Sequence, residues 1–342
     1  MMKYFGSAFG VALAGLGASF WLGGAAGLWI AFVLSILEVS LSFDNAVVNA
    51  QVLKTMDETW RHRFITWGMA IAVFGMRFIF PLAIVSIATG VNPWAAFILA
   101  VERPDEYKHI LESVHVSVMG FGGSFLMMVA LKYFIDIEKE THWIEAIEKR
   151  LTVLGKIEAI QAALTLGIVY VTSRVIGQLH GSEEATSFLV SSIFGVITYI
   201  LVDGLEAFIG VDEGDVTGAV VKSGLASFLY LEVLDSSFSF DGVLGALALT
   251  NNIFIIAIGL GIGAMFVRSL TLLMVDKGTV DQFIYMEAGA FWAILGLAVI
   301  MFINTVYEIP ETVTGLIGAA FIAASIVSSV RYNNVAKSLI AE

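Results

Sequence analysis

In the stretch Glu38-Val39-Ser40-Leu41-Ser42-Phe43-Asp44-Asn45, two carboxylates lie inside an otherwise apolar run, 29–52. The pattern returns later in the chain as Asp235-Ser236-Ser237-Phe238-Ser239-Phe240-Asp241-Gly242, preceded by Glu232. An alignment without gaps matches acid with acid, serine with serine and phenylalanine with phenylalanine: Glu38 with Asp235, Ser40 with Ser237, Ser42 with Ser239, Phe43 with Phe240, and Asp44 with Asp241. A carboxylate in the hydrocarbon layer costs roughly 3 kcal/mol or more, so such residues are expected to be functional.

The composition is that of an all-α membrane protein. Of the 342 residues, 58% are hydrophobic and 14% are charged, whereas soluble domains carry roughly a quarter charged residues. Several apolar runs reach the ~20 residues that cross a bilayer as a helix. The chain has no cysteine, which excludes disulfides and thiolate metal sites. Its net charge of −12 argues against nucleic acid as a partner.

Hydropathy predicts a polytopic bundle of about ten spans. The expected ranges are 5–24, 27–52, 64–89, 113–135, 158–177, 187–205, 223–249, 253–275, 283–304 and 311–330. The first could be a signal peptide, but it continues through Phe20-Trp21-Leu22 without a clear cleavage site, so we expect it to be retained. A cytoplasmic N-terminus leaves only Arg103 and Lys108 clearly on the outer side, with Arg174 near a span end. This asymmetry predicts that both termini are cytoplasmic.

Three segments between the spans are distinctive. The segment 92–109 is too short to span and is expected to form an interfacial helix on the outer side. The segment 136–156 carries Glu and Lys at helical spacing, which predicts a solvated extension or hairpin without a site. The acidic segment 203–215 is also expected to be solvated.

The repeat extends beyond the acidic motif. Gly68 and Arg77 have the same separation as Gly259 and Arg268, each pair in the span that follows the acidic one. Gly122-Gly123 and Gly289 mark a third, small-residue span in each half. The second acidic span comes an odd number of spans after the first, which predicts opposite orientations, as in many secondary transporters.

We therefore expect a single membrane domain, 1–342, in five parts. The leading span comes first and is followed by a first repeat at 27–135. A connecting segment with two spans at 136–222, an inverted second repeat at 223–304, and a C-terminal span and tail at 305–342 complete the chain.

The motifs supply hard oxygen ligands. The predicted metal ligands are Asp44, Asp241, Glu38, Asp235, Asn45 and Glu232, supported by Ser40, Ser42, Ser237, Ser239, Arg77 and Arg268. Oxygen ligands suit Mn²⁺, Ca²⁺ or Mg²⁺, and the five histidines lie outside the motifs, which argues against Zn²⁺ there. The metal would be a substrate, because nothing in the sequence calls for a prosthetic group.

The spacing of the acids predicts broken helices. On an ideal helix Glu38 and Asp44 point ~120° apart, so both face one site only if the helix is interrupted. Asn45, Gly242 and Gly245 are candidate break points, and we expect discontinuities near Asp44 and near Asp241. The two arginines either pair with the acids as structural ion pairs, or hold the carboxylates charged and compete with the cation for them.

Together the acidic motifs, the arginine spans and the Gly122-Gly123 span resemble the TerC family of integral membrane proteins, named for tellurium resistance and related to the lysine-exporter superfamily. The resemblance covers roughly 27–135 and 223–304. It implies export of metal ions, chiefly manganese, with Asp44 and Asp241 as the firmest ligands, followed by Glu38, Asn45 and Asp235. Glu232 has no counterpart in the first motif, and Gly242 stands where the first motif has Asn45.

The leading hypothesis is a secondary transporter that exports a divalent cation, Mn²⁺ above all, in possible exchange for protons. The alternatives are an exporter of small organic cations or amino acids, an intramembrane aspartyl protease with two membrane aspartates, and a non-transporting membrane assembly factor. We expect a transporter and no enzyme. The expected location is the inner (plasma) membrane, with lipid, metal ions and protons as partners and homo-oligomers left open.

Overall fold

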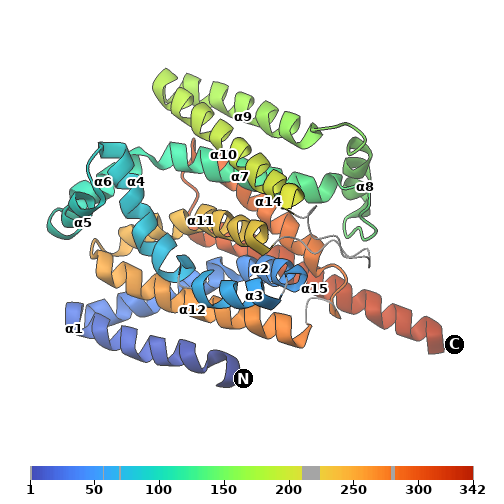
Figure 1. Cartoon of the computed structure of the whole chain (residues 1–342), viewed down its shortest axis with the longest axis horizontal. Helices are drawn as coiled ribbons and strands as arrows, with labels where there is room; N and C mark the ends of the chain where they lie inside the picture. Colours follow the sequence, from blue (N-terminus) through green and yellow to red (C-terminus); the bar gives the residue numbers. More distant parts are fainter. Residues whose placement is uncertain (1, 57, 69–70, 210–223, 279–281, 342) are drawn as a thin grey trace.

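The computed structural model describes residues 2–56, 58–68, 71–209, 224–278 and 282–341. Side chains at 55, 72, 73, 205–209, 226, 238, 241, 311, 312 and 335–341 are outside this description. Every regular element in these ranges is a helix, which confirms the all-α class (Figure 1). The first half contains α1 Met2–Leu41, α2 Phe43–Thr55, α3 Glu58–Arg63, η1 Phe64–Gly68, η2 Ile71–Ile79, α4 Phe80–Thr89, α5 Pro93–Glu102, α6 Pro104–Ser113 and α7 His115–Ile135. The second contains α8 Glu145–Leu154, α9 Ile160–Leu179, α10 Ser182–Ile209, α11 Gly224–Leu249, α12 Ile253–Lys277, α14 Met286–Asn304 and α15 Glu311–Ala341.

Among the described residues, seven helices are long and apolar enough to cross a membrane. The number is eight if Phe74–Thr89 and Pro93–Glu102, which meet at 105°, are counted as one broken span. The chain is therefore a multi-pass membrane protein. The long helix α11 is not among the seven, and it carries the acids Glu232, Asp235 and Asp241. The short α5 and α6 occupy the segment that was expected to be interfacial.

The helix α1 is a hairpin of two helical segments. Gly23 and Gly24 have non-helical torsions, and Gly24 has a φ of 60°, which glycine adopts without strain. Beyond this turn the chain folds back, and a Cβ at Gly27 would lie 2.6 Å from the Ser19 carbonyl oxygen. Figure 1 shows the two segments side by side, next to α12. The hairpin agrees with the separate predicted spans 5–24 and 27–52.

The two predicted repeats exchange partners in the same way. The arginine helix of the second half, α12, packs on α1 and α2, and the arginine helix of the first half, η2, packs on α11. Likewise α14 packs on α2, and α7 packs on α11. The like pairs, α7 with α14 and η2 with α12, also touch. Reciprocal contacts of this kind are what a duplicated unit is expected to make, whereas the inverted orientation remains a prediction.

The predicted discontinuity is present in one motif and not in the other. α1 ends at Leu41 and α2 begins at Phe43, with Ser42 between them at φ −101° and ψ 17°. α11 instead runs from Gly224 to Leu249 without interruption, so the break expected near Asp241 is wrong. A glycine weakens a helix by only about 1 kcal/mol, and packing against several neighbouring helices is enough to keep α11 continuous through Gly242 and Gly245.

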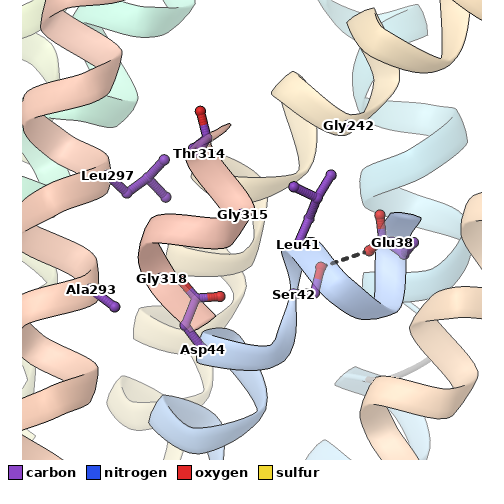
Figure 2. A pocket seen from close by; sticks show the side chains of 10 residues that line it. All are labelled: Glu38, Leu41, Ser42, Asp44, Gly242, Ala293, Leu297, Thr314, Gly315 and Gly318. Atoms are coloured by element: carbon purple, nitrogen blue, oxygen red, sulfur yellow. Dashed lines mark hydrogen bonds between the residues drawn. The ribbon is translucent and has the colours of Figure 1, made fainter. Parts of the chain in front are cut away.

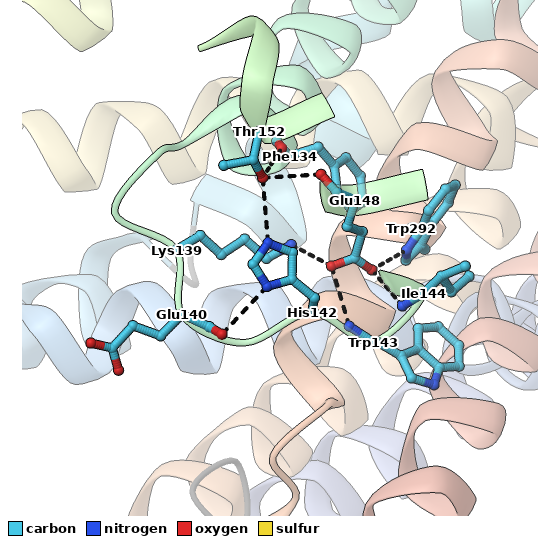
Figure 3. A network of polar contacts seen from close by, with 9 residues as sticks. All are labelled: Phe134, Lys139, Glu140, His142, Trp143, Ile144, Glu148, Thr152 and Trp292. Carbon is cyan, nitrogen blue, oxygen red and sulfur yellow. Dashed lines mark hydrogen bonds and ion pairs between the residues drawn. The ribbon is translucent and has the colours of Figure 1, made fainter. Parts of the chain in front are cut away.

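The segment 136–156 contains a network of polar contacts around Glu148 (Figure 3). The Glu148 side chain is fully buried and pairs with Lys139 at 2.6 Å. Its Oε1 accepts hydrogen bonds from the Ile144 N–H at 3.0 Å and from the Trp292 indole N–H at 2.9 Å. Most residues of the segment are exposed or half-buried, as expected, and Glu148 is the buried exception. Trp292 belongs to α14, and charge spacing within the segment gives no sign of that partner.

Burial alone would raise the pKa of the Glu148 carboxyl group. The hydrogen bonds from Lys139, Ile144 and Trp292, together with the charge of Lys139, outweigh burial and lower the pKa below its usual value. Because the pKa is lower in the folded state, the ionised carboxylate stabilises the fold at neutral pH. That stabilisation is lost as the pH falls from the ordinary value of ~4.3 through the folded pKa.

We expect Glu148→Gln to lower the free energy of unfolding by about 2 kcal/mol at pH 7, because Lys139 loses its charged acceptor. The difference from wild type should shrink below about pH 4.3. Thermal unfolding in detergent at both pH values measures it. The matched control is Glu145→Gln, since Glu145 is exposed and pairs with Lys149. Equal effects of the two variants would contradict this role for Glu148.

Candidate functional site

The buried polar site is organised around Arg77, at the end of η2. Its guanidinium forms an ion pair with Glu38 Oε1 across the helix interface. The side chains of both residues are more than 90% buried. The Ser42 hydroxyl donates to the same Glu38 oxygen at 3.0 Å. The structural ion pair foreseen for Arg77 is therefore present, and it joins the first acidic motif to its own repeat's arginine helix.

Two acids of the second motif also face Arg77. Asp235 and Glu232, both on α11, are close enough to the guanidinium to interact with it electrostatically. Asp235 accepts a hydrogen bond from the Asn49 amide at 3.4 Å. Glu232 is buried, and neither of its carboxyl oxygens has a hydrogen-bond partner among the described residues. One guanidinium thus faces carboxyl groups from both motifs, and full ionisation would leave negative charge for a cation or for protons to offset.

The fourth described acid of the motifs, Asp44, lines a cavity that it shares with Glu38 (Figure 2). Asp44 is 6% exposed and accepts a hydrogen bond from the Asn45 N–H at 3.0 Å. The central cavity has a volume of about 40 Å³ and is lined by Glu38, Leu41, Ser42, Asp44, Gly242, Ala293, Leu297, Thr314, Gly315 and Gly318. A cavity of this size holds one or a few waters, or a cation stripped of most of its water.

Glycines allow the acids to approach the neighbouring helices. A Cβ at Gly263 would lie 2.4 Å from the Cβ of Glu38, and one at Gly242 would lie 3.4 Å from Glu38 Oε2. A Cβ at Gly68 would lie 2.9 Å from Glu232 Oε1. These glycines therefore serve the close packing of helices around the acids.

Two larger cavities flank the central one. The Lys132 vestibule, of about 270 Å³, is lined by Val48, Gln51, Val52, Val129, Lys132, Tyr133, Asp136, Tyr199, Asp203, Ser227, Tyr230, Glu287 and Phe291. The His115 vestibule, of about 900 Å³, is wider and open to solvent. Its polar lining residues are Glu112, His115, His180, Glu184, Asn304, Thr305 and Glu308. Lys132 and Asp203 form an ion pair in the first vestibule.

The three cavities follow one another along α14. Glu287 and Phe291 line the Lys132 vestibule, Ala293 and Leu297 line the central cavity, and Asn304 lines the His115 vestibule. The helix has 19 residues and is therefore ~28 Å long, close to the ~30 Å hydrocarbon core.

The same order holds on the acidic helices. In the first motif, Leu37 lines the His115 vestibule, Asp44 the central cavity and Val48 the Lys132 vestibule. On α11, Tyr230 lines the Lys132 vestibule, Gly242 the central cavity and Leu244 the His115 vestibule. Cavities with polar groups in their walls thus succeed one another across the bundle, and Asp44 lines the smallest of the three.

The predicted ligands do not form one cluster. In the described part of the chain, no group of three His, Cys, Asp or Glu residues is arranged to hold a metal ion. Glu38, Asp235 and Glu232 gather at Arg77, and Asp44 lines the central cavity with Glu38. Asn45 is buried, with an amide oxygen that no described residue hydrogen-bonds. The Asp241 side chain lies outside the described residues.

Some of the predicted supporting serines and arginines contact the site, and others do not. Ser42 reaches Glu38, and Ser239 donates to the Met76 carbonyl at 3.2 Å. Ser237 bonds within its own helix. Ser40 is exposed and also bonds within its own helix, so it is outside the site. Arg268 donates to the Ile65 carbonyl at 2.8 Å, and no described carboxylate forms an ion pair with it.

Comparison with protein families assigns the chain to one family. A family model described as "Protein of unknown function (DUF475)" matches residues 43–336. The chain belongs to the DUF475 family. No curated protein and no solved structure matches it. The DUF475 match contains Asp44, Arg77, all of α11 and α15 as far as residue 336, and it begins five residues after Glu38.

Three residues of the site were not predicted from the sequence motifs. Asn49 meets Asp235, and its position four residues after Asn45, on the same helix face, is a signal that was available. Thr314 and Gly318 line the central cavity from α15, which lies outside both repeats. No repeat or motif marks them, because only the tertiary packing brings α15 against α1 and α2.

Proposed function

We propose that this DUF475 protein is a secondary transporter that exports a divalent metal cation from the cytoplasm across the inner (plasma) membrane. The observation that carries the proposal is the row of three cavities along the bundle, the smallest of which is lined by the buried carboxylate of Asp44. Acids inside a membrane bundle mark ion pathways. The bundle's reciprocal packing is also that expected of transporters built from repeats.

The size of the central cavity favours an inorganic cation over an organic one. A volume of about 40 Å³ accommodates a metal ion with a water or two, and it is far below the 300–1,000 Å³ of typical small-molecule sites. Amino acids and organic cations are the weaker candidates for this reason. We propose transport and assign no catalytic role to the acids.

Mn²⁺ is the proposed cargo within the divalent class. It accepts oxygen-only sites and stands low in the affinity series, so a site with few carboxylates can release it. The resemblance of the acidic motifs to the TerC family supports the same cation. Protons are the proposed counter-ion, since the carboxyl groups around Arg77 outnumber its charge.

The test is flux into proteoliposomes containing the purified full chain, with Mn²⁺, Ca²⁺, Mg²⁺, Zn²⁺ and lysine offered separately and the internal pH recorded. We expect Mn²⁺ movement above that of protein-free vesicles, with opposite movement of protons. Lysine flux without metal flux would favour the organic-cation alternative. If neither moves, the transporter proposal is wrong and a role in membrane assembly becomes the better explanation.

A further inference from the structure

The last helix, α15, forms one wall of the central cavity although it belongs to neither repeat. Thr314, Gly315 and Gly318 all line this cavity. Their spacing places Thr314 and Gly318 one helical turn apart on the same face of α15. The opposite wall is the interrupted first motif, from Glu38 to Asp44. Figure 2 shows α15 running across the cavity from Thr314 to Gly318.

The Asp44 carboxyl group lies against this wall. A Cβ at Gly318 would be 2.9 Å from Asp44 Oδ2, so Gly318 leaves open the space in front of the carboxylate. Oδ1 accepts the Asn45 N–H, whereas no described residue donates to Oδ2. A buried carboxylate oxygen without a protein donor, aimed into a cavity, is suited to receive a cation.

Gly315 has a different structural role from Gly318. A Cβ there would lie 2.2 Å from the Leu41 Cδ2 and 3.2 Å from the Leu41 Cα. It therefore allows α15 to approach the end of α1, and its substitution is expected to disturb packing. Gly318 meets only the tip of a side chain, which makes it the more informative position to change.

We propose that α15 completes the cation site, with Gly318 keeping room for a partly dehydrated cation beside Asp44 and Thr314 placing a hydroxyl group one helical turn away, where it can bind a water of that cation. This inference rests on the proposed transport function. Thr314 is half-buried, and no hydrogen bond engages its hydroxyl group within the described structure. A methyl group is about as large as a water molecule, so an alanine at 318 would displace about one water-sized volume from the part of the cavity next to Asp44.

The experiment compares Gly318→Ala with Gly296→Ala in Mn²⁺-loaded proteoliposomes of the full chain. Gly296 also faces α15, but a Cβ there would make only ordinary contacts of 3.5 Å with Ile317 and Phe321. We expect Gly318→Ala to lower Mn²⁺ flux by at least about tenfold, while Gly296→Ala retains the wild-type rate. Gel-filtration profiles and thermal unfolding verify that both variants fold.

A second pair of variants tests the role of α15 without adding volume to the packed helix interface. Thr314→Val removes the hydroxyl at nearly constant shape and is expected to weaken the apparent Mn²⁺ affinity by about tenfold, whereas Thr314→Ser restores it. Direct Mn²⁺ binding in detergent provides a readout besides flux. If Gly318→Ala does not fold, the comparison of Thr314→Val with Thr314→Ser still tests whether α15 contributes to the cation site.

The outcomes separate the two proposals. Absence of cation flux in the wild type would overturn the proposed function itself. Wild-type flux that Asp44→Asn abolishes, with Gly318→Ala and Thr314→Val both indistinguishable from wild type, would leave the transporter standing and overturn the role of α15. A lower Mn²⁺ affinity in Thr314→Val that Thr314→Ser does not restore would also reject the proposed role of the hydroxyl group.

Discussion

Replacement of Asp44 by asparagine is expected to reduce Mn²⁺ flux to the level of protein-free vesicles while the protein remains folded. Asp44 and Glu38 are the described acids that line the central cavity, and Glu38 is engaged by Arg77 and Ser42. Asp44 therefore supplies the charge that is free to meet a cation. Asparagine keeps the shape and an oxygen that can accept the Asn45 N–H, but it removes that charge.

The same substitution is expected to leave the melting temperature unchanged or to raise it. A buried carboxylate without a cationic partner costs free energy in a membrane, and its neutral isostere does not carry this cost. Residues that reduce stability and are nevertheless required for activity are typical of functional sites. Proteoliposome flux and thermal unfolding of the same preparation measure both effects.

Asp276→Asn is the matched control for Asp44→Asn. Asp276 is about half exposed and pairs with Lys3 at 3.4 Å, away from the three cavities. An exposed pair of this kind contributes roughly 0–1 kcal/mol, so we expect wild-type flux and nearly wild-type stability. Undiminished flux in Asp44→Asn would overturn the assignment, and equal losses in both variants would point to a general effect of charge.

The sequence predicted the helical class and the burial of Glu38, Asp44, Glu232 and Asp235, because both depend on local patterns. Acids in apolar runs must be buried or line a cavity, and two copies of one motif are expected to meet at an interface. In the structure Glu38 and Asp235 both approach Arg77, from different halves of the chain. The pairing of Arg77 with an acid follows from the same argument, since a buried guanidinium requires one.

The sequence overstated the symmetry of the halves. Arg268 aligns with Arg77, yet it donates to the Ile65 carbonyl, while the second motif's Asp235 lies near Arg77. The first motif is interrupted at Ser42, while α11 continues through Gly242. Duplicated sequences diverge in the partners that each helix meets, and an alignment of the two motifs contains no information about those partners.

The missed residues have a common physical reason. Thr314 and Gly318 join the cavity, and Trp292 reaches Glu148, through contacts between segments far apart in the chain. Hydropathy and charge spacing describe one helix at a time. Such contacts therefore become visible only when the helices are packed.

Replacement of Arg77 by methionine is expected to be the most destabilising single change at the site. Arg77 faces Glu38, Asp235 and Glu232, and its loss leaves their carboxyl groups without its charge in a buried position. Removal of one partner of a buried ion pair typically costs about 3–5 kcal/mol. We expect a fall of this size in the free energy of unfolding, measured by thermal or denaturant unfolding in detergent.

Arg268→Met is the matched control, because Arg268 occupies the equivalent place in the second repeat. Its guanidinium donates to a neutral carbonyl, so the expected loss is only about 1 kcal/mol. The double variant Glu38→Gln with Arg77→Met should lose less than the sum of the single variants, since the two residues share one interaction. Equal destabilisation by Arg268→Met and Arg77→Met would mean that helix packing, rather than the carboxyl groups around Arg77, sets the cost. Strict additivity of Glu38→Gln and Arg77→Met would show that the two residues are not coupled in the folded protein.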